Sequence, residues 1–275
     1  MALPGRGTVF VRERTGPSGA PALLLLHGWT ASADLNWFAA YEPLGRGFSV
    51  VAADHRGHGR GLPLRRRFRL DQCADDAAAL VASLGLGSVV VVGYSLGGAV
   101  AQVLWRRHRG LVDGLVLCAT AHRFIDRPRE RLGFAALGGL ALVSRAVGSP
   151  LRRHLAHRLL GTRANGCRPL DGWALDQMSR HDWTAVLSAG AAIGRFDSRS
   201  WVGEIDVPTA VVATTGDRTV AAHRQLALAG AIPGATLHLV DGDHTVCARA
   251  PDRFVPVLVE ACRSVVGRVT AAGPG

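Results

Sequence analysis

The stretch SVVVVGYSLGGAVAQVLW, residues 88–105, joins two kinds of secondary structure without a linker. Its valines, Val89–Val92, are β-branched and continuous, and a run with no polar alternation is typical of a strand covered on both faces of a parallel sheet. From Ala99 to Trp105 the apolar residues suit a buried helix. The pattern therefore predicts a strand that passes into a helix through a very sharp turn.

Ser95 lies in that turn. Such a turn holds the serine backbone in a strained conformation and pushes the hydroxyl clear of the chain. Side chains at Gly93 and Gly97 would collide with the neighbouring helix and strand, which accounts for the two glycines. The start of the helix behind Ser95 offers free backbone N–H groups and a partial positive charge. These features suit a nucleophile, and the simpler alternative is a glycine-rich turn with an incidental serine.

Short apolar runs alternate with helical segments along most of the chain, which predicts an α/β fold with a mostly parallel sheet and helices on both faces. We expect strands at residues 8–12, 22–26, 48–53, 89–92, 115–118, 210–213 and 236–240, and helices at 70–84, 98–108, 221–231 and 252–266. The rhythm breaks between residues 122 and 200, where no convincing strand occurs. We expect residues 1–121 and 201–275 to form the core and residues 122–200 to form a helical cap.

Composition points to a reduced compartment. The five cysteines are odd in number and scattered, with no C-x-x-C pair. The first ten residues, MALPGRGTVF, lack the apolar core of a signal peptide. No apolar run approaches the ~18 residues that a membrane span needs. We therefore expect a cytoplasmic protein with no stable membrane insertion.

The charge is strongly basic, at +11, and every one of the 32 basic residues is arginine. Residues 122–200 hold 13 arginines against 6 acidic residues, so +7 of the charge lies there. Exclusive use of arginine, with abundant alanine and glycine, is typical of a GC-rich genome, and a solvated basic surface is our main interpretation. Steering of an anionic substrate is the alternative. No aromatic interleaving or DNA-binding motif favours nucleic acid.

A serine nucleophile needs a base, and His244 is the best placed of the 11 histidines. It lies in LVDGDHTVCARAP, just after the last expected strand, where the sites of open α/β sheets gather. Asp217 follows the preceding strand and can orient the imidazole from across the site. A helix-capping role is the alternative for Asp217. Asp241 and Asp243 are closer in sequence but lie in the same loop as the base.

An oxyanion hole requires two backbone N–H groups. Leu96, next to Ser95, supplies one of them. The loop after LLLL supplies the other, because Gly28 lets the chain bend and the N–H of Trp29 then points into the site. His27 is interpreted as a residue that fixes this loop through hydrogen bonds.

Taken together, these motifs resemble those of the α/β-hydrolase fold family. HGW at 27–29, DHRGHG at 54–59, GYSLGG at 93–98, GD at 216–217 and DH at 243–244 occur in the family's order and span nearly the whole chain. The resemblance implies a Ser95–Asp217–His244 triad and a mostly parallel sheet of seven or eight strands. It also implies a nucleophile elbow that includes Gly93, Tyr94, Gly97 and Gly98, a helical cap, and no metal or cofactor.

The chain departs from the family pattern at three places. The N-terminal region is short, so the first hairpin of the fold is expected to be reduced. The usual G-x-x-D spacing before the acid is compressed to Gly216-Asp217, and Arg60 follows DHRGHG where serine is common. None of these departures removes a catalytic group.

Serine at position 95 argues against the dehalogenase and epoxide-hydrolase branches, which use aspartate there. The resemblance then implies acyl transfer to water by a carboxylesterase, lactonase or thioesterase. A non-catalytic small-molecule binding protein and an acyltransferase are the alternatives on the same fold.

The substrate is expected to be a small acyl compound, with its class set by the cap. The apolar stretch GFAALGGLALV at 133–143, like Leu151, Leu155, Leu159 and Leu160, is more typical of core packing. If part of the cap lines the pocket, the substrate is hydrophobic. Leu140 and Trp183 are the positions expected on such an inner face.

Overall fold

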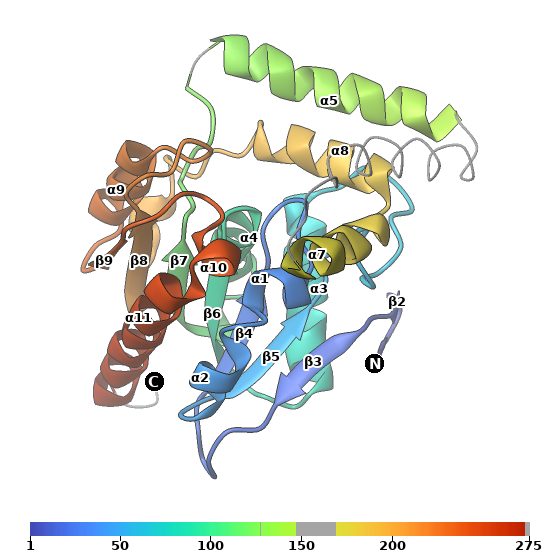
Figure 1. The fold of residues 1–275 in the computed structure, drawn as a ribbon. Coiled ribbons are helices and arrows are strands. Elements are labelled where there is room, and N and C mark those ends of the chain that lie inside the picture. Colours follow the sequence, from blue (N-terminus) through green and yellow to red (C-terminus); the bar gives the residue numbers. More distant parts are fainter. Residues whose placement is uncertain (127, 147–168, 273–275) are drawn as a thin grey trace.

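The computed structural model describes residues 1–126, 128–146 and 169–272, and its centre is one seven-stranded sheet (Figure 1). The order of strands across the sheet is β3-β5-β4-β6-β7-β8-β9. Their bounds are Val11–Arg14 (β3), Ala22–Leu26 (β4), Ser49–Ala53 (β5), Val89–Tyr94 (β6), Val112–Cys118 (β7), Thr209–Thr214 (β8) and Thr236–Val240 (β9). Only the edge strand β3 is antiparallel to its neighbour, so the prediction of a mostly parallel sheet is confirmed.

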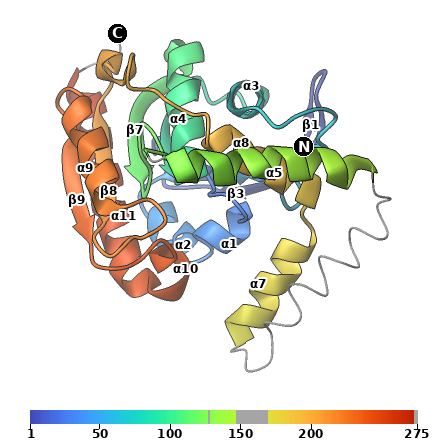
Figure 2. The ribbon, with the colours of Figure 1, turned by 90° about the horizontal axis from the view of Figure 1, so that it is seen from above.

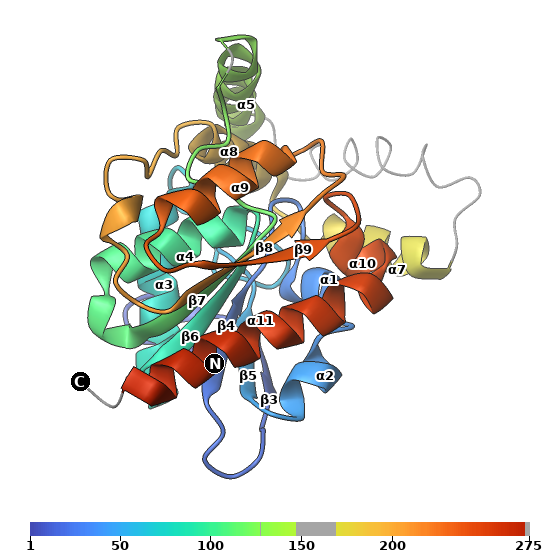
Figure 3. The ribbon, with the colours of Figure 1, turned by 90° about the vertical axis from the view of Figure 1, so that its left-hand side faces the viewer.

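Alternation along the strands divides the core into two layers. In β4, Leu24 and Leu26 face one layer, whereas Leu23 and Leu25 face the other. The first layer is formed with α3 (Leu70–Ser83), α4 (Leu96–Arg107) and α9 (Ala222–Ala231), and the second with α1 (Ala33–Trp37), α2 (Tyr41–Gly45), α10 (Val246–Arg249) and α11 (Pro251–Ala272). Figure 3 shows the two helical layers on opposite faces of the twisted sheet.

The N-terminus differs from the predicted strand at residues 8–12. Two short strands, β1 (Ala2–Leu3) and β2 (Gly7–Thr8), form a separate antiparallel pair, and the sheet strand begins later, at Val11. The chain turns between them because Gly5 and Gly7 adopt positive φ angles of 69° and 126°. The five-residue helices α1 and α2 were not predicted, since they are too short to show a helical period.

The inserted segment, residues 122–200, contributes three described helices between β7 and β8. They are α5 (Pro128–Ala146), α7 (Pro169–Ser179) and α8 (Trp183–Ile193). Figure 2, seen from above, shows α5 lying across α8, and the hydroxyls of Ser144 and Thr184 join the two helices at 2.9 Å. The ends of the segment meet, because the N–H of Ser198 donates to the carbonyl of His122 at 2.8 Å.

Leu140 does not belong to an inner face, because its side chain is 53% exposed on the outside of α5. Phe134 and Leu137 face inward instead: Phe134 lies against Gly194, the residue that follows α8, and Leu137 lies against Gly190 within α8. The four leucines at 151, 155, 159 and 160 lie outside the described residues. In the described ranges, no helix combines the length and apolar character needed to cross a membrane.

Candidate active site

The turn between β6 and α4 holds Ser95 in an unusual backbone conformation. Its φ of 53° and ψ of −113° lie outside the regions that side-chain-bearing residues normally occupy. The conformation is fixed by the end of β7, because the N–H of Ser95 donates to the carbonyl of Cys118 and its own carbonyl accepts from Thr120 Oγ1, both at 2.8 Å. The neighbouring strand thus holds this turn in place.

The glycines around Ser95 are required by close backbone approaches. A Cβ atom on Gly93 would overlap the backbone of Gly97 and Gly98, and one on Gly97 would overlap the carbonyl of Leu26 in β4. A Cβ on Gly98 would overlap the side chain of Thr120. The strand, the turn and the first helical residues therefore pack more tightly than any larger residue permits.

The structure brings Ser95, His244 and Asp217 into one chain of hydrogen bonds. His244 Nε2 lies 3.0 Å from Ser95 Oγ, and His244 Nδ1 lies 2.7 Å from Asp217 Oδ2. A carboxylate only accepts, so Nδ1 carries the proton and Nε2 of the neutral ring accepts from the serine hydroxyl. This is the geometry that a general base next to a nucleophile needs.

Asp217 uses its two oxygens for different purposes. Oδ1 accepts from the backbone N–H groups of Thr219 and Val220, at 2.8 and 2.9 Å, and so fixes the turn before α9. Oδ2 accepts from His244 and also from Thr214 Oγ1 and Gln225 Nε2. One carboxylate therefore both fixes the turn before α9, as the alternative interpretation from sequence expected, and accepts a hydrogen bond from the imidazole.

The electrostatics of Asp217 favour its charged form. Burial alone raises the pKa of this carboxyl, but the hydrogen bond and charge of His244, the N–H of Val220 and the hydroxyl of Thr214 outweigh burial and lower the pKa below its ordinary value. Asp243 bonds to Thr245 instead, and Asp241 to Arg253, both at the exposed surface. Neither of those two carboxylates contacts the imidazole of His244.

The loop after β4 passes beside Ser95. A Cβ atom on Gly28 would lie 3.5 Å from Cβ of Ser95, and the N–H of Gly28 donates to Asn36 Oδ1 at 2.9 Å. Among the residues that the structure describes, none accepts a hydrogen bond from the backbone N–H of Trp29 or of Leu96. These two donors remain available for a negatively charged oxygen.

His27 is buried beneath this loop and joins it to the loop after β5. Its Nδ1–H donates to the carbonyl of Gly28 at 2.8 Å, and its Nε2 accepts from the backbone N–H of His55, also at 2.8 Å. Burial, reinforced by the neighbouring His55 and His58, lowers the pKa of His27 well below its ordinary value. Its ring is therefore neutral, with one donor and one acceptor both in use.

The sequence did not reveal several residues that support the site. Asn36 holds Gly28, whereas Thr214 and Gln225 hold the carboxylate of Asp217. Gln225 gives no distinct signal either, because it follows two other polar residues, His223 and Arg224, at the start of α9. Its contact with Asp217 depends on the rotation of that helix, which the sequence does not define.

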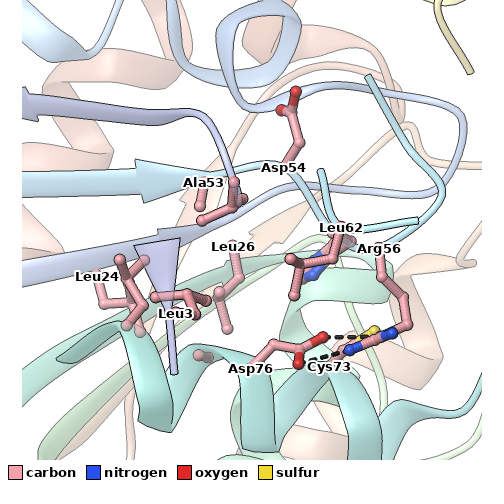
Figure 4. A pocket seen from close by; sticks show the side chains of 13 residues that line it. Leu3, Leu24, Leu26, Ala53, Asp54, Arg56, Leu62, Cys73 and Asp76 are labelled. Atoms are coloured by element: carbon pink, nitrogen blue, oxygen red, sulfur yellow. Dashed lines mark hydrogen bonds and ion pairs between the residues drawn. The ribbon is translucent and has the colours of Figure 1, made fainter. Parts of the chain in front are cut away.

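A cavity of about 30 Å³ lies away from these residues, beneath the loop after β5. Figure 4 shows leucines 3, 24, 26 and 62 around it and the carboxylate of Asp76 facing the guanidinium of Arg56. The two side chains form an ion pair at 2.7 Å. Its volume is of the order of one water molecule, so it does not accommodate an organic substrate.

A larger hollow, of about 400 Å³, lies between α5 and α8. Its lining combines apolar residues with arginines and includes Ile125, Phe134, Phe196, Arg123, Arg131 and Arg195. The ring of Phe134 lies 6.2 Å from that of Trp29, so one wall of the hollow adjoins the loop beside Ser95.

Comparison with known proteins agrees with this architecture. The family model described as "alpha/beta hydrolase fold" matches residues 21–251. RutD of Agrobacterium fabrum, provisionally named a carbamate hydrolase, is 32% identical over 86% of this chain and 90% of its own length. A pimeloyl-[acyl-carrier protein] methyl ester esterase of Aromatoleum aromaticum is 33% identical over 61% of this chain and 74% of its own. The solved enol-lactonase of Burkholderia xenovorans superposes with a TM-score of 0.79 at 24% identity, covering 95% of this chain and 98% of that one.

Proposed function

Because the chain belongs to the α/β-hydrolase fold family, we propose that it is a serine hydrolase that cleaves a carboxylic ester, lactone or thioester through an acyl-enzyme. The observation that carries the proposal is the continuous chain of hydrogen bonds from Ser95 Oγ through His244 to Asp217, at 3.0 and 2.7 Å. Two of its relatives are named for the hydrolysis of a carbamate and of a methyl ester, and both names support the same type of chemistry.

In the proposed reaction, Ser95 Oγ attacks the carbonyl carbon of the substrate while His244 Nε2 accepts the hydroxyl proton. Asp217 accepts from Nδ1–H and stabilises the imidazolium that forms. The backbone N–H groups of Leu96 and Trp29 donate to the oxyanion of the tetrahedral intermediate. When the carbon–oxygen or carbon–sulfur bond breaks, His244 returns the proton to the leaving group, and the acyl group remains on Ser95.

Water then completes the cycle. His244 takes a proton from the water molecule, the resulting hydroxide attacks the acyl carbon, and the carboxylic acid leaves as Ser95 Oγ recovers its proton. The inserted helices are proposed to act as a cap that keeps bulk water from the oxyanion and shapes the acyl pocket. The contact between Phe134 and Trp29 supports that role.

The test is covalent labelling of Ser95 together with ester turnover. A fluorophosphonate should add to the Ser95-containing peptide, as read by mass spectrometry, and the protein should hydrolyse a p-nitrophenyl ester. Ser95→Ala should lose both properties. Labelling that persists in Ser95→Ala would contradict the assignment, and labelling of Ser95 without turnover of esters, lactones, thioesters or carbamates would favour a binding protein on this fold.

A further inference from the structure

We propose that His181, in the turn between α7 and α8, is a positioning residue that holds the oxyanion loop in its active conformation through the carbonyl of Thr30. This inference rests on the proposed function, because it concerns the donor that Trp29 supplies. The oxyanion loop is defined here as residues 28–32. Nothing about the local sequence of the inserted segment identifies His181 for this role.

The oxyanion loop needs external support because its own backbone provides little. Thr30, which follows Trp29, has a φ of 61°, in the left-handed region that non-glycine residues rarely occupy. The backbone bond that closes the turn, from the N–H of Ala31 to the carbonyl of Gly28, is long at 3.4 Å. A strained conformation with weak internal bonding persists only when neighbouring structure holds it.

That neighbouring structure comes from the inserted segment, about 150 residues further along the chain. His181 Nε2 lies 3.1 Å from the carbonyl oxygen of Thr30, and the indole N–H of Trp29 donates to the carbonyl of Val186 at 2.7 Å. Ser32 Oγ donates to Gln177 Oε1 at 3.2 Å. Three of the five residues of the loop are therefore bonded to α7, α8 or the turn between them.

His181 is the member of this set whose own orientation is fixed from both sides. Its Nδ1 accepts from the backbone N–H of Gly59 at 2.7 Å, so in the neutral ring the proton lies on Nε2, which donates to Thr30. The next residue, Asp182, donates from its backbone N–H to the carbonyl of Gly57 at 3.0 Å. The side chain is 5% exposed and lies against the ring of His58 at 5.3 Å.

These contacts hold the backbone N–H of Trp29 in place before the reaction begins. Asn36 fixes the backbone on one side of that amide, at Gly28, and His181 fixes it on the other, at Thr30. A donor held in place before reaction stabilises the oxyanion more than one that must be reoriented in the transition state. Loss of the His181 bond should therefore lower kcat more than it raises KM.

Two substitutions at the same position separate the two bonds of His181. His181→Gln places an amide N–H near the position of Nε2, and so can keep the bond to Thr30 while it loses the acceptor for Gly59. His181→Asn places an amide oxygen near the position of Nδ1, so it keeps the bond from Gly59 and loses the bond to Thr30. Each variant gives up one hydrogen bond, which makes them matched controls for stability.

We expect His181→Asn to reduce kcat for p-nitrophenyl acetate by about 10-fold to 100-fold and to change KM by less than about twofold. This decrease in kcat is smaller than the decrease caused by complete removal of an oxyanion donor, because the Trp29 N–H is displaced and not lost. The rate of Ser95 phosphonylation by a fluorophosphonate should fall in parallel, and His181→Gln should retain most of both rates. Ser188→Ala removes another buried bond from the inserted segment, to the N–H of Phe68 at 3.0 Å. It should lower Tm but leave kcat unchanged.

Wild-type rates in a folded His181→Asn variant would overturn the proposal, as would equal losses in the Asn, Gln and Ser188→Ala variants. If His181→Asn does not fold by circular dichroism, Trp29→Phe takes its place. That variant removes the indole N–H that donates to Val186, together with part of the ring that packs against Gly190 and Phe134. An unchanged kcat would then overturn the proposal that α7–α8 positions the loop. A wild-type protein that is neither labelled nor active would instead reject the proposed function itself.

Discussion

Tyr94 donates a hydrogen bond from its phenolic oxygen to the backbone carbonyl of His244, at 2.9 Å. Tyr94 is the last residue of β6 and directly precedes Ser95. His244 lies in the loop after β9, which is an edge strand of the sheet. The side chain of Tyr94 thus joins the strand that leads to Ser95, the proposed nucleophile, with the loop that carries His244, the proposed base. It fixes the main chain of His244, while Asp217 fixes the ring.

We predict that Tyr94→Phe will destabilise the protein by about 1 kcal/mol, the net value of an ordinary hydrogen bond, and will lower kcat several-fold because His244 becomes less well positioned. Urea denaturation and steady-state kinetics measure the two effects. Tyr41→Phe is the control, since the hydroxyl of Tyr41 makes only a 3.5 Å contact with Asp34, away from the site. An unchanged kcat in Tyr94→Phe would show that the loop keeps its position without this bond.

Asp217→Asn should lower kcat by about 10⁴-fold, the order found when an aspartate that orients a catalytic histidine is replaced. The amide presents an N–H where Nδ1–H of His244 needs an acceptor, so the ring adopts the wrong tautomer. Asp243→Asn should leave turnover near that of the wild type, because this exposed carboxylate accepts from the N–H and hydroxyl of Thr245 and not from the imidazole of His244. The reverse result for the two variants would assign the acid to Asp243.

Acid should destabilise the protein between pH 6.5 and pH 4 because of its buried histidines. Burial lowers the pKa of His55 to about 4 and lowers those of His27, His58 and His181 as well. In this interval the unfolded chain binds protons that the folded chain does not, so the free energy of unfolding falls as the pH falls. For His55 alone the loss is about 3 kcal/mol.

Chemical denaturation of His55→Gln at pH 7.5 and pH 4 tests this prediction. The amide can keep the contact with the carbonyl of His27, so the variant should lose about 3 kcal/mol less than the wild type over this interval. His223→Gln, at an exposed position on α9, should follow the wild type. Identical pH dependence in His55→Gln and the wild type would show that His55 is not the residue responsible.

Phe134→Ala should change the preference of the enzyme between short and long acyl esters. Phe134 lines the hollow between α5 and α8 and also contacts Trp29, so its removal enlarges the space next to the site. The ratio of kcat/KM for p-nitrophenyl octanoate to that for the acetate should rise. Leu140→Ala, on the exposed side of the same helix, is the matched control and should leave the ratio unchanged. A uniform loss on both esters in Phe134→Ala would indicate a purely structural role.

The sheet was predictable from sequence because its strands are short, continuous apolar runs. The expected strands at 22–26 and 236–240 coincide with β4 and β9. The positions of Ser95, Asp217 and His244 could be predicted from the sequence for a related reason. Each follows a parallel strand, and the carboxyl ends of parallel strands meet at one edge of the sheet. Local sequence then suffices to place such residues near one another.

The supporting residues could not be predicted in the same way. Asn36 and Gln225 reach the site from helices, so their contacts depend on helix rotation and packing. The same limit explains Leu140, because the stretch 133–143 is apolar nearly all round and shows no clear inner face. His181 acts across two segments of chain that no local pattern connects.

The backbone of Ser95 has a consequence for how this protein can change by mutation. A φ of 53° with a ψ of −113° suits glycine better than serine. Ser95→Gly should therefore relieve strain and increase thermal stability while it removes the proposed nucleophile. Under the proposed mechanism, stability and activity are opposed at this one residue. Selection for stability alone would then favour glycine here and give an inactive but more stable protein, whereas selection for the reaction would retain the serine.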